Sequence, residues 1–150
     1  MKSLMLLLVT FLSAAIVNAD VIQLKTEKCE DNQVSLNSVY EMRTYSNSQI
    51  KVFSIDTIEP AAVPVSLAIT LDRGEDLSTY ESYCRRISYI SSIDSLSSMD
   101  SSFDAKANTL SLSIKIKQMN EDGDFVSKTL KIKVNKSAQR EEEIVQAVTQ

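Results

Sequence analysis

The chain has no histidine and no tryptophan, and its 150 residues include only two glycines and two prolines. The absence of histidine excludes the usual Ser-His-Asp and Cys-His catalytic arrangements and histidine-based zinc or iron sites. The two glycines, Gly74 and Gly123, stand far apart, which excludes a glycine-rich loop around a phosphate. An enzyme would have to use carboxylates or a Ser-Lys pair, and no acidic pair is singled out by its surroundings. We therefore assign no catalytic residue, metal ligand or cofactor and favour a protein that is not an enzyme.

Charge of one sign is not concentrated in any part of the sequence. The chain carries 16 Lys and Arg against 20 Asp and Glu, which gives a net charge of −4 at pH 7. Binding to nucleic acid needs a concentrated basic face, and no segment supplies one. We therefore expect no nucleic-acid partner.

Residues 1–19 have the pattern of a secretory signal peptide. Lys2 makes the N-terminus positive, and residues 4–16 carry no charge. This run is shorter than the about 20 residues that a membrane-spanning helix needs, and no later segment is long and apolar enough. The small residue Ala19 predicts cleavage directly after it. We expect an exported protein, periplasmic or extracellular, without a transmembrane segment, in which residues 20–150 form a single globular α+β domain.

Cys29 and Cys84 are the only two cysteines of the chain. An even number of cysteines in an exported chain predicts a disulfide bond. Two free buried thiols, or one bond between two chains, are the alternatives. Catalytic dithiols usually lie close together in sequence, as in Cys-x-x-Cys, so the wide spacing argues against a redox function.

Alternation of apolar and polar residues predicts several short strands after the leader. The predicted strands are 20–25, 38–45, 49–56, 63–71, 110–117 and 126–134. The second and third of these flank small polar residues and should form a hairpin. The last two flank an Asp-Gly sequence at 122–123, which favours a tight reversal between them.

Three segments have features of helices. Apolar residues from Leu77 to Ile90 recur at helical spacing, which predicts a helix with Cys84 on its buried face. Residues 88–102 contain eight serines with evenly spaced apolar residues between them, and predict a short second helix or an irregular segment on the core. Ser137, followed by three acids, predicts a C-terminal helix. The expected fold is α+β, a mostly antiparallel sheet of about six strands with two or three helices packed on one face.

Tyrosine and arginine cluster most densely in residues 80–89 of the chain. Both residue types are enriched at binding hot spots, because they combine contact area with hydrogen bonding. Tyrosines earlier in this segment fall on the predicted buried stripe. The candidate binding residues are therefore Arg85, Arg86 and Tyr89, and the expected partner is another protein or a component of the cell envelope.

Two other functions stay open at this point. The first is binding of a small apolar ligand between the sheet and its helices, in a cavity lined by residues such as Phe53, Leu67, Ile87 and Ile114. The second is a carboxylate-dependent glycan hydrolase, which requires two acids facing one cleft about 5–10 Å apart. The protein-binding or envelope-assembly function is our leading hypothesis, because the composition offers few reactive groups.

Overall fold

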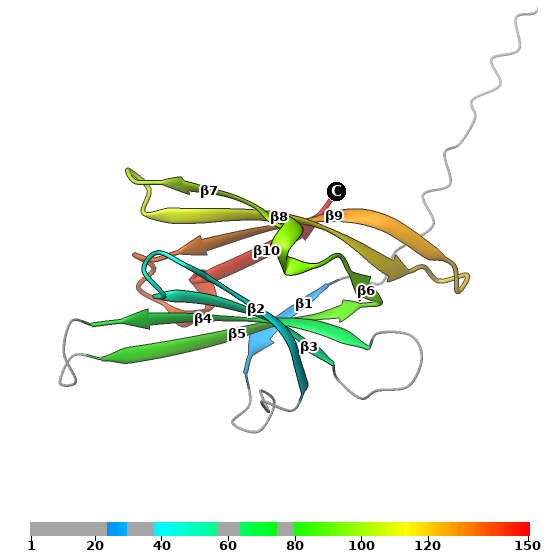
Figure 1. The fold of residues 1–150 in the computed structure, drawn as a ribbon, viewed down its shortest axis with the longest axis horizontal. Coiled ribbons are helices and arrows are strands. Elements are labelled where there is room, and N and C mark those ends of the chain that lie inside the picture. The colour runs from blue at the N-terminus through cyan, green and yellow to red at the C-terminus, as the bar shows by residue number, and fades with distance from the viewer. Residues whose placement is uncertain (1–23, 30–37, 57–63, 75–79) are drawn as a thin grey trace, which may run out of the picture.

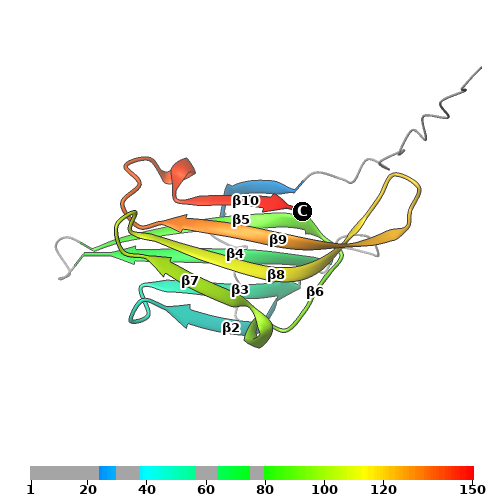
Figure 2. The ribbon, with the colours of Figure 1, turned by 90° about the horizontal axis from the view of Figure 1, so that it is seen from above.

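Two antiparallel five-stranded sheets lie face to face in this computed structural model, which describes residues 24–29, 38–56, 64–74 and 80–150 (Figures 1 and 2). The first sheet contains β1 (Lys25–Lys28), β2 (Val39–Tyr45), β3 (Ile50–Asp56), β4 (Val65–Arg73) and β5 (Glu81–Ile90) in the order β1-β5-β4-β3-β2. The second sheet contains β6 (Ser92–Ile93), β7 (Asp100–Asp104), β8 (Thr109–Met119), β9 (Phe125–Asn135) and β10 (Val145–Thr149) in the order β10-β9-β8-β6, and β7 also pairs with β8. The predicted signal peptide, residues 1–19, lies outside the described residues.

The core of the sandwich is built from strands whose apolar residues alternate with polar ones. Every second residue of β8 from Leu110 to Gln118, and of β9 from Leu130 to Val134, turns inward, and these residues are at most 4% exposed. Facing them are apolar residues of β3, β4 and β5, such as Val52, Leu67 and Ile87, which are fully buried. The two predicted hairpins are confirmed as β2–β3 and β8–β9, and the strand predicted at 63–71 is confirmed as β4.

The fold is nearly all β, so the predicted α+β class with helices on one face is wrong. The predicted helix up to Ile90 is instead strand β5, and Leu77 lies outside the described residues. Ile87 pairs with Leu67, whereas Ile90 pairs with Val65, so β5 holds one extra residue at this point. This β-bulge, in which Tyr89 has a φ of 69°, turns both isoleucines into the core at a spacing of three. Such a spacing resembles that of a helix.

Of the two structures predicted for the serine-rich segment, a short second helix or an irregular segment on the core, the second is confirmed. It forms β6, the single 3-10 turn η2 (Leu96–Ser98) and β7. Leu96 and Met99 are buried in the core, whereas Phe103 is half exposed. The segment therefore pairs with the edge of β8 and places the side chains of Leu96 and Met99 in the core between the sheets.

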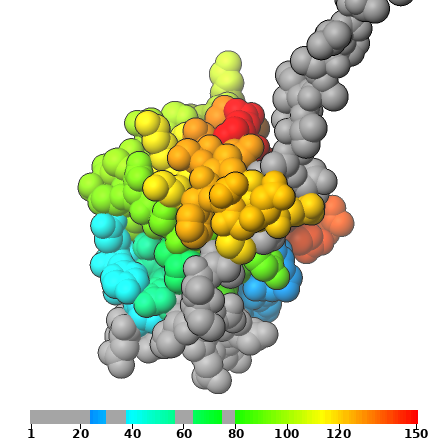
Figure 3. All heavy atoms as spheres, turned by 90° about the vertical axis from the view of Figure 1, so that its right-hand side faces the viewer, coloured from blue at the N-terminus to red at the C-terminus, as the bar shows by residue number. Residues whose placement is uncertain are grey.

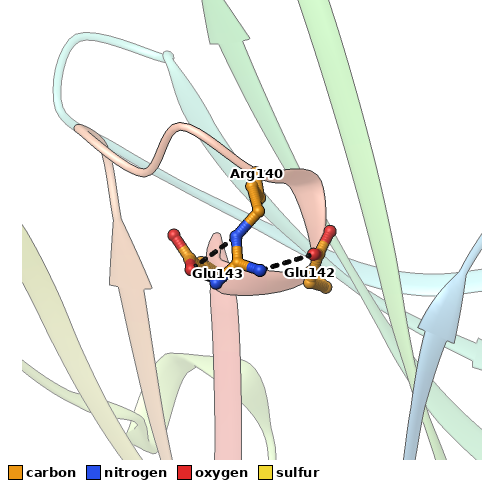
Figure 4. Close-up of polar contacts among 3 residues, drawn as sticks. All are labelled: Arg140, Glu142 and Glu143. Carbon is orange, nitrogen blue, oxygen red and sulfur yellow. Dashed lines mark hydrogen bonds and ion pairs between the residues drawn. The ribbon is translucent and has the colours of Figure 1, made fainter.

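The predicted C-terminal helix is also wrong, since the acids form one 3-10 turn, η3 (Glu141–Glu143), followed by strand β10. Arg140 lies between Glu142 and Glu143 on this turn, and its Nε donates to Glu143 Oε1 at 2.8 Å (Figure 4). A short isolated helix is marginal in water, whereas β10 forms a ladder of five residue pairs with β9. The β-branched residues of this segment also favour a strand.

The predicted disulfide is confirmed, since Cys29 and Cys84 are bonded and no free cysteine remains. Their Cα atoms are 5.4 Å apart, and Cys29 N–H donates to the Cys84 carbonyl at 3.1 Å. The bond joins two neighbouring strands of one sheet at the end of β1, rather than a helix to a strand. Within the described part of the chain, no helix is long and apolar enough to cross a lipid bilayer.

Candidate interface at the free edge of β2

The three predicted binding residues are not brought together by the fold. Arg85 turns toward the second sheet and donates to the Thr26 carbonyl at 3.3 Å, whereas Arg86 lies on the opposite face of β5 and donates to Ser66 Oγ at 3.2 Å. Tyr89 stands at the bulge and is partly exposed. Adjacent residues of a strand point to opposite faces, which is why this cluster in the sequence is no cluster in space.

The residues named for the two other functions are also distributed differently from the expectation. Leu67, Ile87 and Ile114 pack in the core, whereas Phe53 lies on the face of β3 that points away from it. Two acids, Asp94 and Asp100, do line one open hollow on the second sheet.

A different feature, the free edge of the first sheet, offers a surface suited to a partner. Among the described strands the edge strand is β2, which pairs with β3 and with no other of them (Figure 2). The Gln49 carbonyl accepts a hydrogen bond from Asp72 N–H at 2.8 Å. Backbone N–H and C=O groups alternate in direction along a strand. The odd-numbered residues of β3 therefore point these groups toward β4, and the even-numbered residues point them toward β2.

Two residues of β2 therefore point their backbone groups to the open edge. Glu41, Arg43 and Tyr45 lie opposite the even-numbered residues of β3. The backbone N–H and C=O groups of these three residues point toward β3 and pair with it. Met42 and Thr44 direct N–H and C=O away from β3, and no hydrogen bond from the described residues reaches these groups. They can pair with a further extended strand.

The side chains beside this edge are apolar or aromatic and exposed. Tyr40 is 70% exposed and Met42 is 58% exposed, and Met42 pairs with Phe53 on the same face of the sheet. The Tyr40 hydroxyl donates to Asp56 Oδ2 at 2.9 Å, and this hydrogen bond raises the pKa of the phenol. Tyrosine, phenylalanine and methionine are all enriched in protein interfaces.

On the inner side of β2, two charged side chains hold η2 beside the edge. Arg43 Nη1 donates to the carbonyls of Leu96 and Met99 at 2.9 and 2.6 Å. Glu41 Oε2 accepts from Leu96 N–H and, at 3.1 Å, from the Ser95 hydroxyl. We call these contacts the β2–η2 clasp. They give each charged side chain hydrogen bonds through one of its atoms, Arg43 Nη1 and Glu41 Oε2, and they tie η2 to β2.

A hollow of about 590 Å³ lies between the edge of β2 and η2. In the space-filling view, the cyan atoms of β2 lie below the yellow-green atoms of the segment that carries η2 (Figure 3). The residues that line it are Glu41, Met42, Arg43, Ser95, Leu96 and Ser97. Because Glu41, Met42 and Arg43 are consecutive residues of β2, the hollow lies against the edge of this strand.

Sequence patterns could not reveal this surface. The alternation in 38–45 predicts a strand, but nothing in it tells whether that strand is central or at an edge. The only local signal is the pair of exposed apolar residues, Tyr40 and Met42, on the polar side of the pattern. Comparison of the chain with protein-family models, with curated protein sequences and with solved structures found no match.

Proposed function

We propose that the mature protein is an exported, non-enzymatic binding domain that takes up an extended segment of a partner protein along the free edge of β2. The observation that carries this proposal is that Met42 and Thr44 direct backbone groups to the open edge of β2, and that a hollow lies beside Met42 on the same strand. In strand addition, hydrogen bonds between main chains supply affinity, and alternate side chains of the added strand supply specificity.

Two features of β2 would otherwise discourage pairing at an edge, a β-bulge and inward-pointing charges. The bulge lies at the start of the strand, between Val39 and Glu41, and leaves Met42 and Thr44 in regular register. The side chains of Glu41 and Arg43 are hydrogen-bonded to backbone groups in the β2–η2 clasp. The stretch that remains open is short and regular, and it fits a partner segment of a few residues.

The test uses crosslinking from the edge in the cells that make the protein. A photoreactive phenylalanine analogue replaces Tyr40, and crosslinked partners are identified by mass spectrometry. We expect one dominant partner protein, whose crosslink is lost with Thr44→Pro or Met42→Lys. Proline cannot donate from the free edge, and a lysine at position 42 is a residue that edges use to prevent pairing.

Val148→Lys is the matched control, because Val148 lies on an edge strand of the other sheet and its exposed fraction, 55%, is similar to the 58% of Met42. This control should leave the crosslink unchanged. With the purified partner, the amides of Met42 and Thr44 should exchange more slowly in the complex. A crosslink that survives both edge variants, or amides that exchange at the same rate in the complex, would reject strand addition.

A further inference from the structure

Four lysines form a line on the outer face of the second sheet. Lys115 and Lys117 of β8 and Lys131 and Lys133 of β9 alternate with buried residues and point away from the core. Two residues along a strand span about 7 Å, so residues on one face occupy levels at this interval. In the β8–β9 register the four lysines belong to four successive residue pairs on this face. The first two pairs carry their lysine on β8, and the next two carry it on β9. The line is therefore about 20 Å long.

Each lysine of this line stands opposite a hydroxyl group on the neighbouring strand. The register pairs Lys117 with Ser127, Lys115 with Thr129, Lys131 with Ser113, and Lys133 with Ser111. No two lysines are direct cross-strand partners, so repulsion between them is limited. The face thus presents a ladder in which amines and hydroxyls lie side by side.

No ion pair within the described residues holds the lysines of this line. None of the four lysines makes an ion pair with a described residue, whereas Lys25, Lys28 and Lys51 each pair with an acid. The chain as a whole carries a net charge of −4. Four unpaired amines in one line, on a protein of the opposite net charge, are complementary to an anionic ligand.

Two adjoining hollows flank the line on the side of β7. One, of about 340 Å³, is lined by residues that include Asp94, Lys115 and Thr129. The other, of about 320 Å³, is lined by residues that include Lys131 and Lys133. Both hollows include Asp100 and Ser113, so together they follow the line along the strands. Oxygen atoms of Asp and Ser can accept hydrogen bonds from hydroxyl groups of a ligand.

We propose that this face binds a linear polysaccharide that carries carboxylate groups. The amines match carboxylates placed at intervals along a chain, and the hydroxyls and aspartates between and beside them match sugar hydroxyls. A single-stranded nucleic acid would need aromatic platforms for its bases, and the residues of this line and its hollows include none. A bilayer would need apolar residues that enter it, and the line consists of amines and hydroxyls.

The probe is polygalacturonate, with binding to the whole mature protein measured by calorimetry at low and at raised salt. We expect saturable binding that weakens with salt, and no binding of the neutral polymer dextran. Lys115→Gln combined with Lys131→Gln should weaken the affinity at least fivefold. The matched control, Lys25→Gln with Lys106→Gln, changes the net charge equally at sites away from the line and should weaken it less than twofold.

A second measurement needs no variant. Acetylation of lysines in the wild-type protein, read by mass spectrometry, should be slowed by polygalacturonate at the four lysines of the line and not at Lys106. Equal loss of affinity in the two double variants, or equal acetylation with and without the polymer, would overturn the proposal. Tighter binding of duplex DNA or of phosphatidylglycerol vesicles at the same salt would assign the face to that ligand and overturn it too. None of these results depends on the edge of β2.

Discussion

Arg43 should be one of the most costly polar residues to remove from this protein. Its Nη1 atom donates to the carbonyls of Leu96 and Met99, and more weakly to that of Ser97 at 3.4 Å. Leu96 and Met99 are themselves buried in the core, so their carbonyls cannot turn freely to water. A hydrogen bond from a charged group contributes about 1.5–3 kcal/mol. Removal of Arg43 takes this donor from the Met99 carbonyl, and leaves the Leu96 carbonyl with the hydrogen bond from Met99 N–H at 3.2 Å. Because the guanidinium is only partly buried, we expect Arg43→Met to lower the free energy of unfolding by about 2–3 kcal/mol.

The assay is urea unfolding at neutral pH, followed by circular dichroism, with the slope m compared between variants. Arg43→Lys should recover less than half of the loss, because a single ammonium group cannot reproduce the reach of the guanidinium fork. Thr44→Ala is the control, because Thr44 is the exposed neighbour on the other face of β2. Glu41→Gln combined with Arg43→Met should be non-additive, because both side chains hold η2. A loss below about 0.5 kcal/mol for Arg43→Met, at unchanged m, would show that the clasp does not hold the sandwich together.

Two further predictions concern the first sheet. Removing the disulfide with Cys29→Ser and Cys84→Ser should lower the free energy of unfolding by up to about 4 kcal/mol, since the bond joins residues 55 apart in sequence; an unchanged urea midpoint would contradict this. Burial alone would raise the pKa of Asp72, but hydrogen bonds from Lys51 and Ser82 lower it below its ordinary value. The ionised form is thus favoured in the folded state, and its contribution is present above the unfolded pKa of about 3.9 and is lost as the pH falls through the lower folded pKa. The stability difference between the wild type and Asp72→Asn should therefore be constant from pH 5 to 7 and shrink below about pH 4, and a difference that grows on acidification would refute the assignment.

The sequence predicted strands correctly where the period of two is unbroken, as in β4, β8 and β9. It failed where tertiary structure breaks the period. In β5 the bulge at Tyr89 shifts Ile90 to the same face as Ile87, and the inward position two residues before Ile87 is occupied by a charged residue, Arg85, which donates to a backbone carbonyl of β1. Both departures remove the alternation and leave apolar residues at a spacing that also suits a helix.

The two proposed surfaces could not be predicted because the sequence alone does not tell which strands pair, or in which register. The lysines of β8 and β9 are scattered in sequence, and only the register between the strands aligns Lys115 with the level next to Lys131. Arg85 and Arg86, which are adjacent in sequence, are separated by the sheet that lies between their side chains. Charge patterns in a β protein have meaning only after the pairing of strands is known, because neighbours on a face come from different strands.

The β2–η2 clasp links the stability of the fold to the surface proposed for the partner. Arg43 and Glu41 hold the wall of the hollow, so their substitution would loosen η2 and change binding and stability together. The backbone groups of Met42 and Thr44 form no part of the clasp and no hydrogen bond within the described sheet. A proline at position 44 therefore removes a donor that only a partner strand would use, at little cost to the fold. Loss of binding in a variant that unfolds at the same urea concentration as the wild type is thus specific for strand addition, and the same loss in an Arg43 variant is not.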